Sequence, residues 1–378
     1  DLIVTGVQTC ALPISIPVAV DSRFCKGVPS GLSCVVLLFG GGYDPSQDET
    51  ISLNTVKMGN ALYMVHAETG TLLWWASNLK SGANLELSGM DYPIPTDLAL
   101  QDANKDGFVD RIYGGDIGGQ LWRIDLNPDD EKVKGGRLLQ VANSSSIDSG
   151  SMTKQRAFFY APAVVELQGT DKNIIAIVSG TRPHPLAGGS EAREQFYALI
   201  DPIDKQGLEW EKGEPLLTPS RLEDVSDIKN TEHVDLRNNE DQVGWYMSLC
   251  NDVNGCDKGS TWLGEKGFSP TYVVDETAYF TTYTPPNQEN DSCSQVDIGY
   301  SRLYAINVIN GGATKEEDEE NSASETKDDA RIKGESKGAQ PTSTPIYTAG
   351  NGIQIVFGIK TITAGTQPFR RVFWTQIE

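Results

Sequence analysis

The apolar residues of this chain fall in short runs, which Gly, Asp, Asn and Pro interrupt. Runs of four to eight apolar residues with such flanks are typical of β-strands. Several runs end in an aromatic-rich segment, and these segments share a theme without sharing a sequence. They are ALYMVHAETGTLLWW around Tyr63, GGQLWRIDL around Trp122, EQFYALIDP around Tyr197, SRLYAINVINGG around Tyr304 and RRVFWTQIE around Trp374.

Upstream of each aromatic-rich segment lies another apolar run. These runs are CVVLLFGGGYD, IPTDLALQD, APAVVELQ with NIIAIVSGTR, FSPTYVVDETAYFTTYTPP and TPIYTAGNGIQIVFGIK. Recurrence with irregular insertions favours stacked four-stranded blades. We therefore predict an all-β fold, a distorted β-propeller over residues 16–378 that is incomplete at its N-terminus. The alternative is a β-sandwich with long loops.

Within the first repeat, the segment ETGTLLW predicts a tight turn between two strands, with Trp74 packed between neighbouring blades. Two other segments look like insertions into the blades. Residues 205–242 are polar and mixed in charge, although part of this segment is expected to pack through Leu208, Trp210, Leu216 and Leu217. Residues 313–340 have almost no apolar side chains and include five consecutive acids, so we predict a disordered acidic loop there.

The N-terminal residues 4–14, VTGVQTCALPI, resemble the translation of a sequencing-library adapter. We therefore expect residues 1–15 to be an artefactual N-terminus that replaces missing upstream sequence, and we leave them out of the fold argument. The alternative is a genuine apolar strand.

The charge balance restricts the partners. The formal net charge is −21, which disfavours nucleic acid and anionic membrane surfaces as partners. No apolar stretch approaches the roughly 20 residues that a membrane-spanning helix needs.

The cysteines suggest export. Without Cys10, which lies in the adapter-like segment, five cysteines remain. Cys25 with Cys34, and Cys250 with Cys256, are plausible small disulfide loops of an exported protein, and Cys293 is left over. Neither pair has the spacing of a zinc or thioredoxin-like site. Buried free thiols in a cytosolic protein are the alternative.

The segment DANKDGFVD carries the strongest chemical signal. Oxygen ligands fall at alternate loop positions 1, 3, 5, 7 and 9, which are Asp102, Asn104, Asp106, Phe108 and Asp110. Ca²⁺ takes six to eight oxygen ligands, and a tightly curled loop turns alternate side chains inward to supply them. Phe108 would contribute its main-chain carbonyl oxygen, and Gly107 permits the sharp turn. We predict that these five residues bind Ca²⁺.

This loop departs from an EF-hand. Position 12 is Tyr113 rather than glutamate, and the flanking segments do not read as helices. We therefore expect a β-hairpin to carry the loop and the calcium affinity to be on the order of micromolar to millimolar. An acidic hairpin turn without a metal is the alternative.

Other chemistry is poorly supported. His66, His184 and His233 occur in unrelated contexts, which argues against a zinc site. The chain has no G-x-S-x-G or P-loop pattern, and acidic residues are too common to single out a glycosidase-type pair. We predict no catalytic residues.

The blades and the loop together resemble the C-terminal β-propeller of the PilC/PilY-type proteins, which act in type IV pilus biogenesis and sit at the pilus tip as adhesins. The resemblance runs from about Val35 to the end of the chain. It rests on LFGGGYD, LYMVHAETGTLLW, DANKDGFVDRIYGGDIGGQLWRIDL, SGTRPHPL with EQFYALID, GEKGFSPTYVVDETAYFTTYTPP and RRVFWTQI.

The resemblance implies a calcium-binding propeller at the cell surface or pilus tip (fimbrium) that is not an enzyme. The family's role is to balance pilus extension against retraction, which supports twitching motility and cell adhesion. Minor pilins and host or abiotic surfaces are the implied partners. The integrin-binding Arg-Gly-Asp motif of some members is missing here, so integrin binding is not carried over.

Two alternatives belong to other classes. TGTLLW also resembles the blade signature of quinoprotein dehydrogenases, but this chain lacks their pair of adjacent cysteines. The other alternative is a generic extracellular scaffold in which calcium only stiffens one hairpin.

Overall fold

The computed structural model describes most of the chain. The described residues are 16–26, 34–45, 58–126, 133–141, 156–167, 169–186, 193–202, 216–249, 264–286, 298–314, 331–337, 346–349, 352–357 and 360–365. The predicted artefactual N-terminus and four of the six cysteines, Cys10, Cys250, Cys256 and Cys293, lie outside these ranges.

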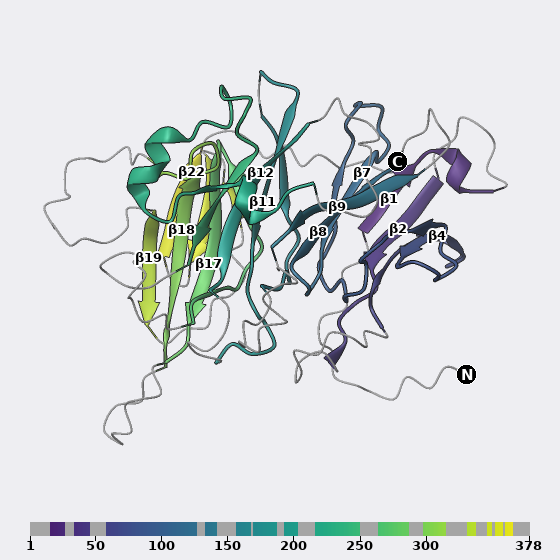
Figure 1. Cartoon of the computed structure of the whole chain (residues 1–378), viewed down its shortest axis with the longest axis horizontal. Coiled ribbons are helices and arrows are strands. Elements are labelled where there is room, and N and C mark those ends of the chain that lie inside the picture. Colours follow the sequence, from purple (N-terminus) through teal and green to yellow (C-terminus); the bar gives the residue numbers. More distant parts are fainter. Residues whose placement is uncertain are drawn as a thin grey trace, which may run out of the picture.

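The described residues form five β-sheets, A to E, that follow one another in chain order. Sheets A to D stand side by side from right to left in Figure 1. Within the described ranges the remaining elements are short 3₁₀ helices, η1 (Ser22–Phe24), η4 (Pro219–Arg221) and η5 (Ile228–His233). No described helix has the length and apolar character needed to cross a membrane.

Sheets A and B are built from neighbouring strands. Sheet A comprises β1 (Ile16–Val20), β2 (Cys34–Gly40), β3 (Ala61–His66), β4 (Leu72–Ser77) and β5 (Leu85–Glu86). Sheet B comprises β6 (Ala99–Gln101), β7 (Arg111–Gly115), β8 (Gln120–Asp125) and β9 (Lys134–Gln140). Strands β1 to β4 and β6 to β9 are antiparallel meanders, and the short β5 joins β4 in parallel.

Sheets C, D and E continue the pattern. Sheet C comprises β10 (Ala163–Glu166), β11 (Lys172–Val178), β12 (Gln195–Pro202), β14 (Gly244–Ser248) and β13 (Glu223–Asp224). Sheet D comprises β15 (Lys266–Gly267), β16 (Tyr272–Val274), β17 (Thr277–Thr284), β18 (Tyr300–Asn307) and β19 (Ile332–Lys337). Sheet E comprises β20 (Ile346–Ala349), β21 (Gly352–Phe357) and β22 (Lys360–Gly365). Sheets A to D each have a four-stranded antiparallel core, and the described part of sheet E has three strands. These consecutive sheets are the blades of the predicted propeller, and the β-sandwich alternative is wrong.

The first repeat folds as predicted. The segment ETGTLLW forms the β3–β4 turn, where Gly70 has φ +67° and the amide of His66 donates to the carbonyl of Thr71 (2.9 Å). Trp74 is buried in the cluster that sheets A and B share. Gly41 in LFGGGYD allows a close approach of two backbone segments, because a Cβ at this position would lie 2.4 Å from the carbonyl oxygen of Gly59.

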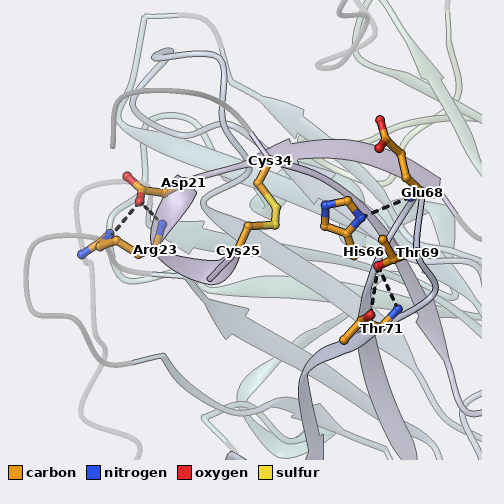
Figure 2. Close-up of a disulfide and its surroundings, with 8 residues drawn as sticks. All are labelled: Asp21, Arg23, Cys25, Cys34, His66, Glu68, Thr69 and Thr71. Carbon is orange, nitrogen blue, oxygen red and sulfur yellow. Dashed lines mark hydrogen bonds and ion pairs between the residues drawn. A yellow bond between two sulfur atoms is a disulfide. The ribbon is translucent and has the colours of Figure 1, made fainter. Parts of the chain in front are cut away.

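One predicted pair of cysteines is joined. Cys25, directly after η1, and Cys34, the first residue of β2, form a disulfide (Figure 2). This bond ties the segment after β1 to the start of β2 in the same sheet.

The predicted acidic insertion needs a correction at its C-terminal end. Residues 332–337 form β19, which pairs with β18, and the side chain of Arg331 is buried. The Arg331 guanidinium donates to the carbonyls of Val225 (2.8 Å) and Ser226 (3.0 Å). These contacts order a segment whose composition alone looks too polar to pack. Residues 315–330 and 338–340 of the predicted insertion lie outside the described ranges.

The polar segment after β12 packs in part, as predicted. Leu216 and Leu217 lie against the cluster between sheets B and C. Further along, Leu222, Val225 and Leu236 are also buried.

Aromatic rings join sheets C and D. Phe280 of β17 stacks on Phe196 of β12 (ring centroids 4.5 Å apart) and on Tyr304 of β18 (5.1 Å). Offset stacks of this kind add to the free energy that ring burial already supplies. This column is therefore the apolar joint between the two sheets.

Replacing Phe280 with alanine should lower the free energy of unfolding by about 3–5 kcal/mol, because it empties a fully buried ring site. Chemical denaturation measures this loss. Phe39→Ala is the control, since Phe39 pairs with Tyr63 on a half-buried face of sheet A. Equal losses for the two variants would contradict the proposed joint.

Candidate metal centre

The loop from Asp102 to Asp110 connects β6 to β7, which are antiparallel neighbours. Gln101 and Arg111 form the last pair of the ladder, and the amide of Asp110 donates to the carbonyl of Gln101 (2.8 Å). The loop is therefore carried by a β-hairpin, as expected from its flanking sequence.

The carboxylates at the two ends of the loop fold the backbone around themselves. Asp102 accepts hydrogen bonds from the amides of Asp106 (3.1 Å) and Gly107 (2.8 Å). Asp110 Oδ2 accepts from the amides of Ala103 (2.8 Å) and Asn104 (3.0 Å). Hydrogen bonds of this local kind are the reason that Asp and Asn favour turns.

The middle of the loop repeats this geometry. Asn104 Oδ1 accepts from the amide of Asp106 (2.9 Å), and Asp106 Oδ1 accepts from the amide of Phe108 (2.9 Å). Lys105 has φ +64° and Gly107 has φ +94°. Left-handed backbone at these positions produces the tight curl, and it explains the glycine at position 6 of the loop.

Three of the predicted ligand side chains converge. The Asn104 amide nitrogen donates to Asp106 Oδ2 (3.1 Å) and to Asp110 Oδ1 (3.4 Å). Asp102, Asp106 and Asp110 do not each bring a carboxylate oxygen within 4.8 Å of the others. The hairpin thus gathers the side chains around one turn, with the three carboxylates still apart.

The chemistry of the donors fits a hard cation. The set contains three carboxylates, one amide oxygen and the main-chain carbonyl of Phe108, and oxygen is the ligand that Ca²⁺ prefers. Each carboxylate has about four lone-pair sites, so the loop hydrogen bonds leave sites for a metal. These five residues could therefore hold Ca²⁺.

Electrostatics at Asp110 favour a nearby positive charge. Burial raises the pKa of this carboxyl above its ordinary value, and the negative charges of Asp106 and Asp102 raise it further. The amides of Asn104 and Ala103 act in the opposite direction. A cation among the three carboxylates would relieve their repulsion and favour the ionised form.

The loop contacts three sheets. The amide of Val109 donates to the carbonyl of Ala19 in β1 (3.1 Å), which belongs to sheet A. The amide of Leu126, just after β8, donates to the carbonyl of Asp110 (2.7 Å). Lys105 Nζ lies 3.1 Å from Glu166 Oε1 of β10, in sheet C. A change in the shape of this loop would therefore alter its contacts with both neighbouring blades.

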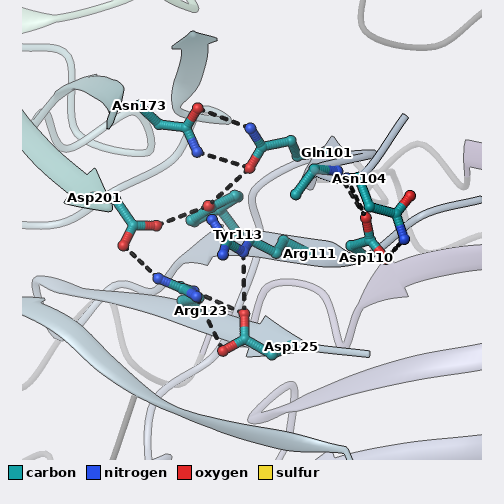
Figure 3. A network of polar contacts seen from close by, with 10 residues as sticks. Gln101, Asn104, Asp110, Arg111, Tyr113, Arg123, Asp125, Asn173 and Asp201 are labelled. Carbon is teal, nitrogen blue, oxygen red and sulfur yellow. Dashed lines mark hydrogen bonds and ion pairs between the residues drawn. The ribbon is translucent and has the colours of Figure 1, made fainter. Parts of the chain in front are cut away.

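Buried polar side chains extend from the base of the loop into the interface between sheets B and C (Figure 3). Gln101, just before the loop, exchanges two amide hydrogen bonds with Asn173 of β11, each 2.8 Å long. Tyr113 of β7 donates to Asp201 of β12 (2.8 Å), and Arg123 of β8 forms an ion pair with the same carboxylate. We call these contacts between sheets B and C the polar seam.

Charge balances within the polar seam. Arg123 also binds Asp125 through two hydrogen bonds of 2.8 and 3.1 Å, and Arg111 lies 3.5 Å from that carboxylate. Two guanidinium groups thus face two carboxylates. Burial lowers the pKa of Arg123, but the attraction of Asp201 and Asp125 outweighs burial and raises it above its ordinary value. Arg123 therefore stays charged.

No sequence pattern predicted the polar seam. Arg123 and Asp125 lie in a strand whose six residues are all buried, so no alternation of polar and apolar positions marks them. Their partner Asp201 is distant in sequence. The one available signal was a charged pair inside the apolar run LWRID.

Comparisons with known proteins agree with the fold. No family model matches the sequence. The chain is 24% identical over 311 residues to the type IV pilus biogenesis factor PilY1 of Pseudomonas aeruginosa, which covers 73% of this chain and 24% of that protein. It is 21% identical over 299 residues to the PilY1 homolog of Xylella fastidiosa, covering 73% and 18%.

A solved structure is also similar. The crystal structure of the Pseudomonas aeruginosa PilY1 C-terminal domain matches with a TM-score of 0.60 and 17% identity, over 94% of this chain and 72% of that domain. The predicted resemblance to the C-terminal propeller of PilC/PilY-type proteins is thereby confirmed. The chain spans about a quarter or less of the curated relatives that it matches.

Replacing Asp201 with alanine should lower the free energy of unfolding by about 3 kcal/mol, because it removes one partner of a buried charge and the acceptor of Tyr113. Urea denaturation measures this loss. The midpoint should fall, while the dependence of the unfolding free energy on urea concentration stays unchanged. Glu166→Gln is the control, since it removes the exposed ion pair between the same sheets and should cost at most about 1 kcal/mol. Similar small losses would show that the polar seam does not hold the sheets together.

Proposed function

We propose that this chain is the calcium-binding β-propeller of a type IV pilus biogenesis protein, exported to the cell surface or pilus tip. In this proposal it engages the pilus through minor pilins, balances pilus extension against retraction, and so supports twitching motility and adhesion to host or abiotic surfaces. The similarity to PilY1 in sequence and in fold supports the pilus role. The observation that carries the calcium role is the oxygen-lined turn of the Asp102–Asp110 hairpin.

Calcium would act through the shape of the hairpin. Asp102, Asn104, Asp106 and Asp110 would hold the ion by side-chain oxygens, and Phe108 by its carbonyl. Because the loop makes a backbone hydrogen bond to sheet A and an exposed ion pair to sheet C, a bound ion would order the contacts of the loop with both neighbouring blades. That edge is where we place the surface that responds to calcium.

Calorimetric titration with Ca²⁺ tests the site. Asp106→Asn keeps a side-chain oxygen that can accept from the amide of Phe108 but removes a charge. We expect it to weaken calcium binding at least about tenfold, or about 1.4 kcal/mol. Asp106→Ala removes the ligand and should weaken binding further.

Asp235→Ala is the matched control for the calorimetric titration. Asp235 also accepts hydrogen bonds from two following amides, those of Arg237 (3.0 Å) and Asn238 (3.1 Å), but it lies outside the loop. Its replacement should leave calcium binding unchanged. Normal calcium binding by both Asp106 variants would show that the site is assigned to the wrong residues.

Surface pili and twitching test the biological role. Deleting the gene in its own bacterium should reduce both, and the wild-type gene should restore them. The Asp106→Asn gene should restore pili only in part, since the calcium-dependent shape is lost. Unchanged pili in the deletion strain would refute the pilus role. Full rescue by the Asp106→Asn gene would show that calcium stabilises the structure but does not regulate the pilus.

A further inference from the structure

Cys25, Cys34 and His66 meet at one corner of sheet A (Figure 2). One ligand atom from each lies within 4.8 Å of the other two, and no other trio of His, Cys, Asp or Glu in the described ranges does this. Both cysteines are 2% exposed, and His66 is half-buried. The sequence predicts a plausible disulfide between the two cysteines, but no motif links His66 to them.

The sheet register explains the meeting. Cys34 and Val36 are two residues apart on β2, so their side chains lie on the same face. His66, the last residue of β3, is the direct partner of Val36 and is therefore a diagonal neighbour of Cys34. Cys25 reaches the same corner from the end of η1, where its amide donates to the carbonyl of Ser22 (3.0 Å).

The His66 ring presents Nε2 to the two sulfurs. Nδ1 accepts a hydrogen bond of 3.3 Å from the amide of Glu68, which leaves Nε2 as the ring nitrogen on the side of the two sulfurs (Figure 2). Ligation through Nε2 would place the imidazole proton on Nδ1 and break the bond to Glu68. Since that bond is long, its loss costs little.

We propose that Cys25, Cys34 and His66 form a redox-gated site for a thiophilic metal ion of the zinc class. In the disulfide state the sulfurs carry no charge and bind no ion. A dithiol reductant passes two electrons and two protons to the disulfide, which yields two thiols and the oxidised, cyclic reductant. Zn²⁺ then takes the two thiolates and the neutral imidazole, and two protons leave.

The ligand chemistry suits this ion. Zinc is bound tetrahedrally by Cys sulfur and His nitrogen, and a site with three protein ligands keeps water in the fourth position. Half-exposed His66 leaves access for that water. A disulfide by itself needs no imidazole beside it, so the histidine is the feature that a purely structural bridge does not explain.

Zinc titration of the full chain tests the proposal. The protein is reduced with a phosphine, because a dithiol would compete for metal, and calcium is present in excess to fill the hairpin loop. Cys25→Ser/Cys34→Ser is compared with Cys250→Ser/Cys256→Ser, a closely spaced pair elsewhere. Both variants keep four of the six cysteines.

We expect Cys25→Ser/Cys34→Ser to lose one tightly bound zinc equivalent, and Cys250→Ser/Cys256→Ser to keep it. A parallel titration with Cd²⁺ should show the thiolate-to-metal charge-transfer absorbance of this site in the second variant and its loss in the first. His66→Gln should weaken zinc binding at least about tenfold, since even outer-shell partners of a metal cost 10–100-fold. Oxidised wild type should bind no zinc at this site. Equal losses in the two double variants, or unchanged affinity in His66→Gln, would overturn the proposal.

Folding is controlled separately. His66→Gln leaves the disulfide intact, so its oxidised form should melt at the wild-type temperature. Near-ultraviolet circular dichroism should show that the reduced wild type keeps its tertiary structure or regains it with Zn²⁺. A reduced chain that stays unfolded with zinc present would count against the site.

Discussion

Arg123 is a buried positive charge in the interface between sheets B and C, and the surrounding structure depends on the carboxylates that form ion pairs with it. Asp125 meets it from the same strand and Asp201 from the neighbouring blade. A buried charge that lost one partner would be costly, so the two blades must keep a fixed position. Tyr113 and the Gln101–Asn173 pair extend the constraint along the joint.

The same constraint reaches the hairpin loop. Gln101 and Arg111 are the residues directly before and after the loop, and both belong to the polar seam. The loop therefore starts at Gln101, which Asn173 of the neighbouring blade holds in place, and ends at Arg111, which Asp125 of its own sheet holds. A fixed base is what a small oxygen cage needs, because a short loop with three carboxylates would otherwise open through their mutual repulsion.

Much of this architecture could be predicted from the sequence. Apolar runs bounded by turn residues located most of the strands, and the alternating oxygen ligands located the loop. The contacts that could not be predicted join residues that lie far apart in the sequence. Arg123 and Asp201 meet across blades, Arg331 finds its acceptors at Val225 and Ser226, and His66 reaches the cysteines through the register of β3 on β2.

Composition was also a poor guide at one place. The acidic stretch after residue 313 predicts disorder on average, but β19 at its end contributes Ile332 opposite Tyr304 and completes sheet D. A strand that gains its stability from a neighbouring strand does not need an apolar sequence of its own. Its order is a tertiary effect, which local composition does not contain.

The most direct test of the central claim is a crystal structure of the chain grown with Ca²⁺, with the ion located by its anomalous scattering. We predict one ion inside the hairpin, about 2.3–2.6 Å from oxygens of Asp102, Asn104, Asp106 and Asp110 and from the carbonyl of Phe108. A loop without an ion at saturating calcium, or an ion held by other residues, would contradict it.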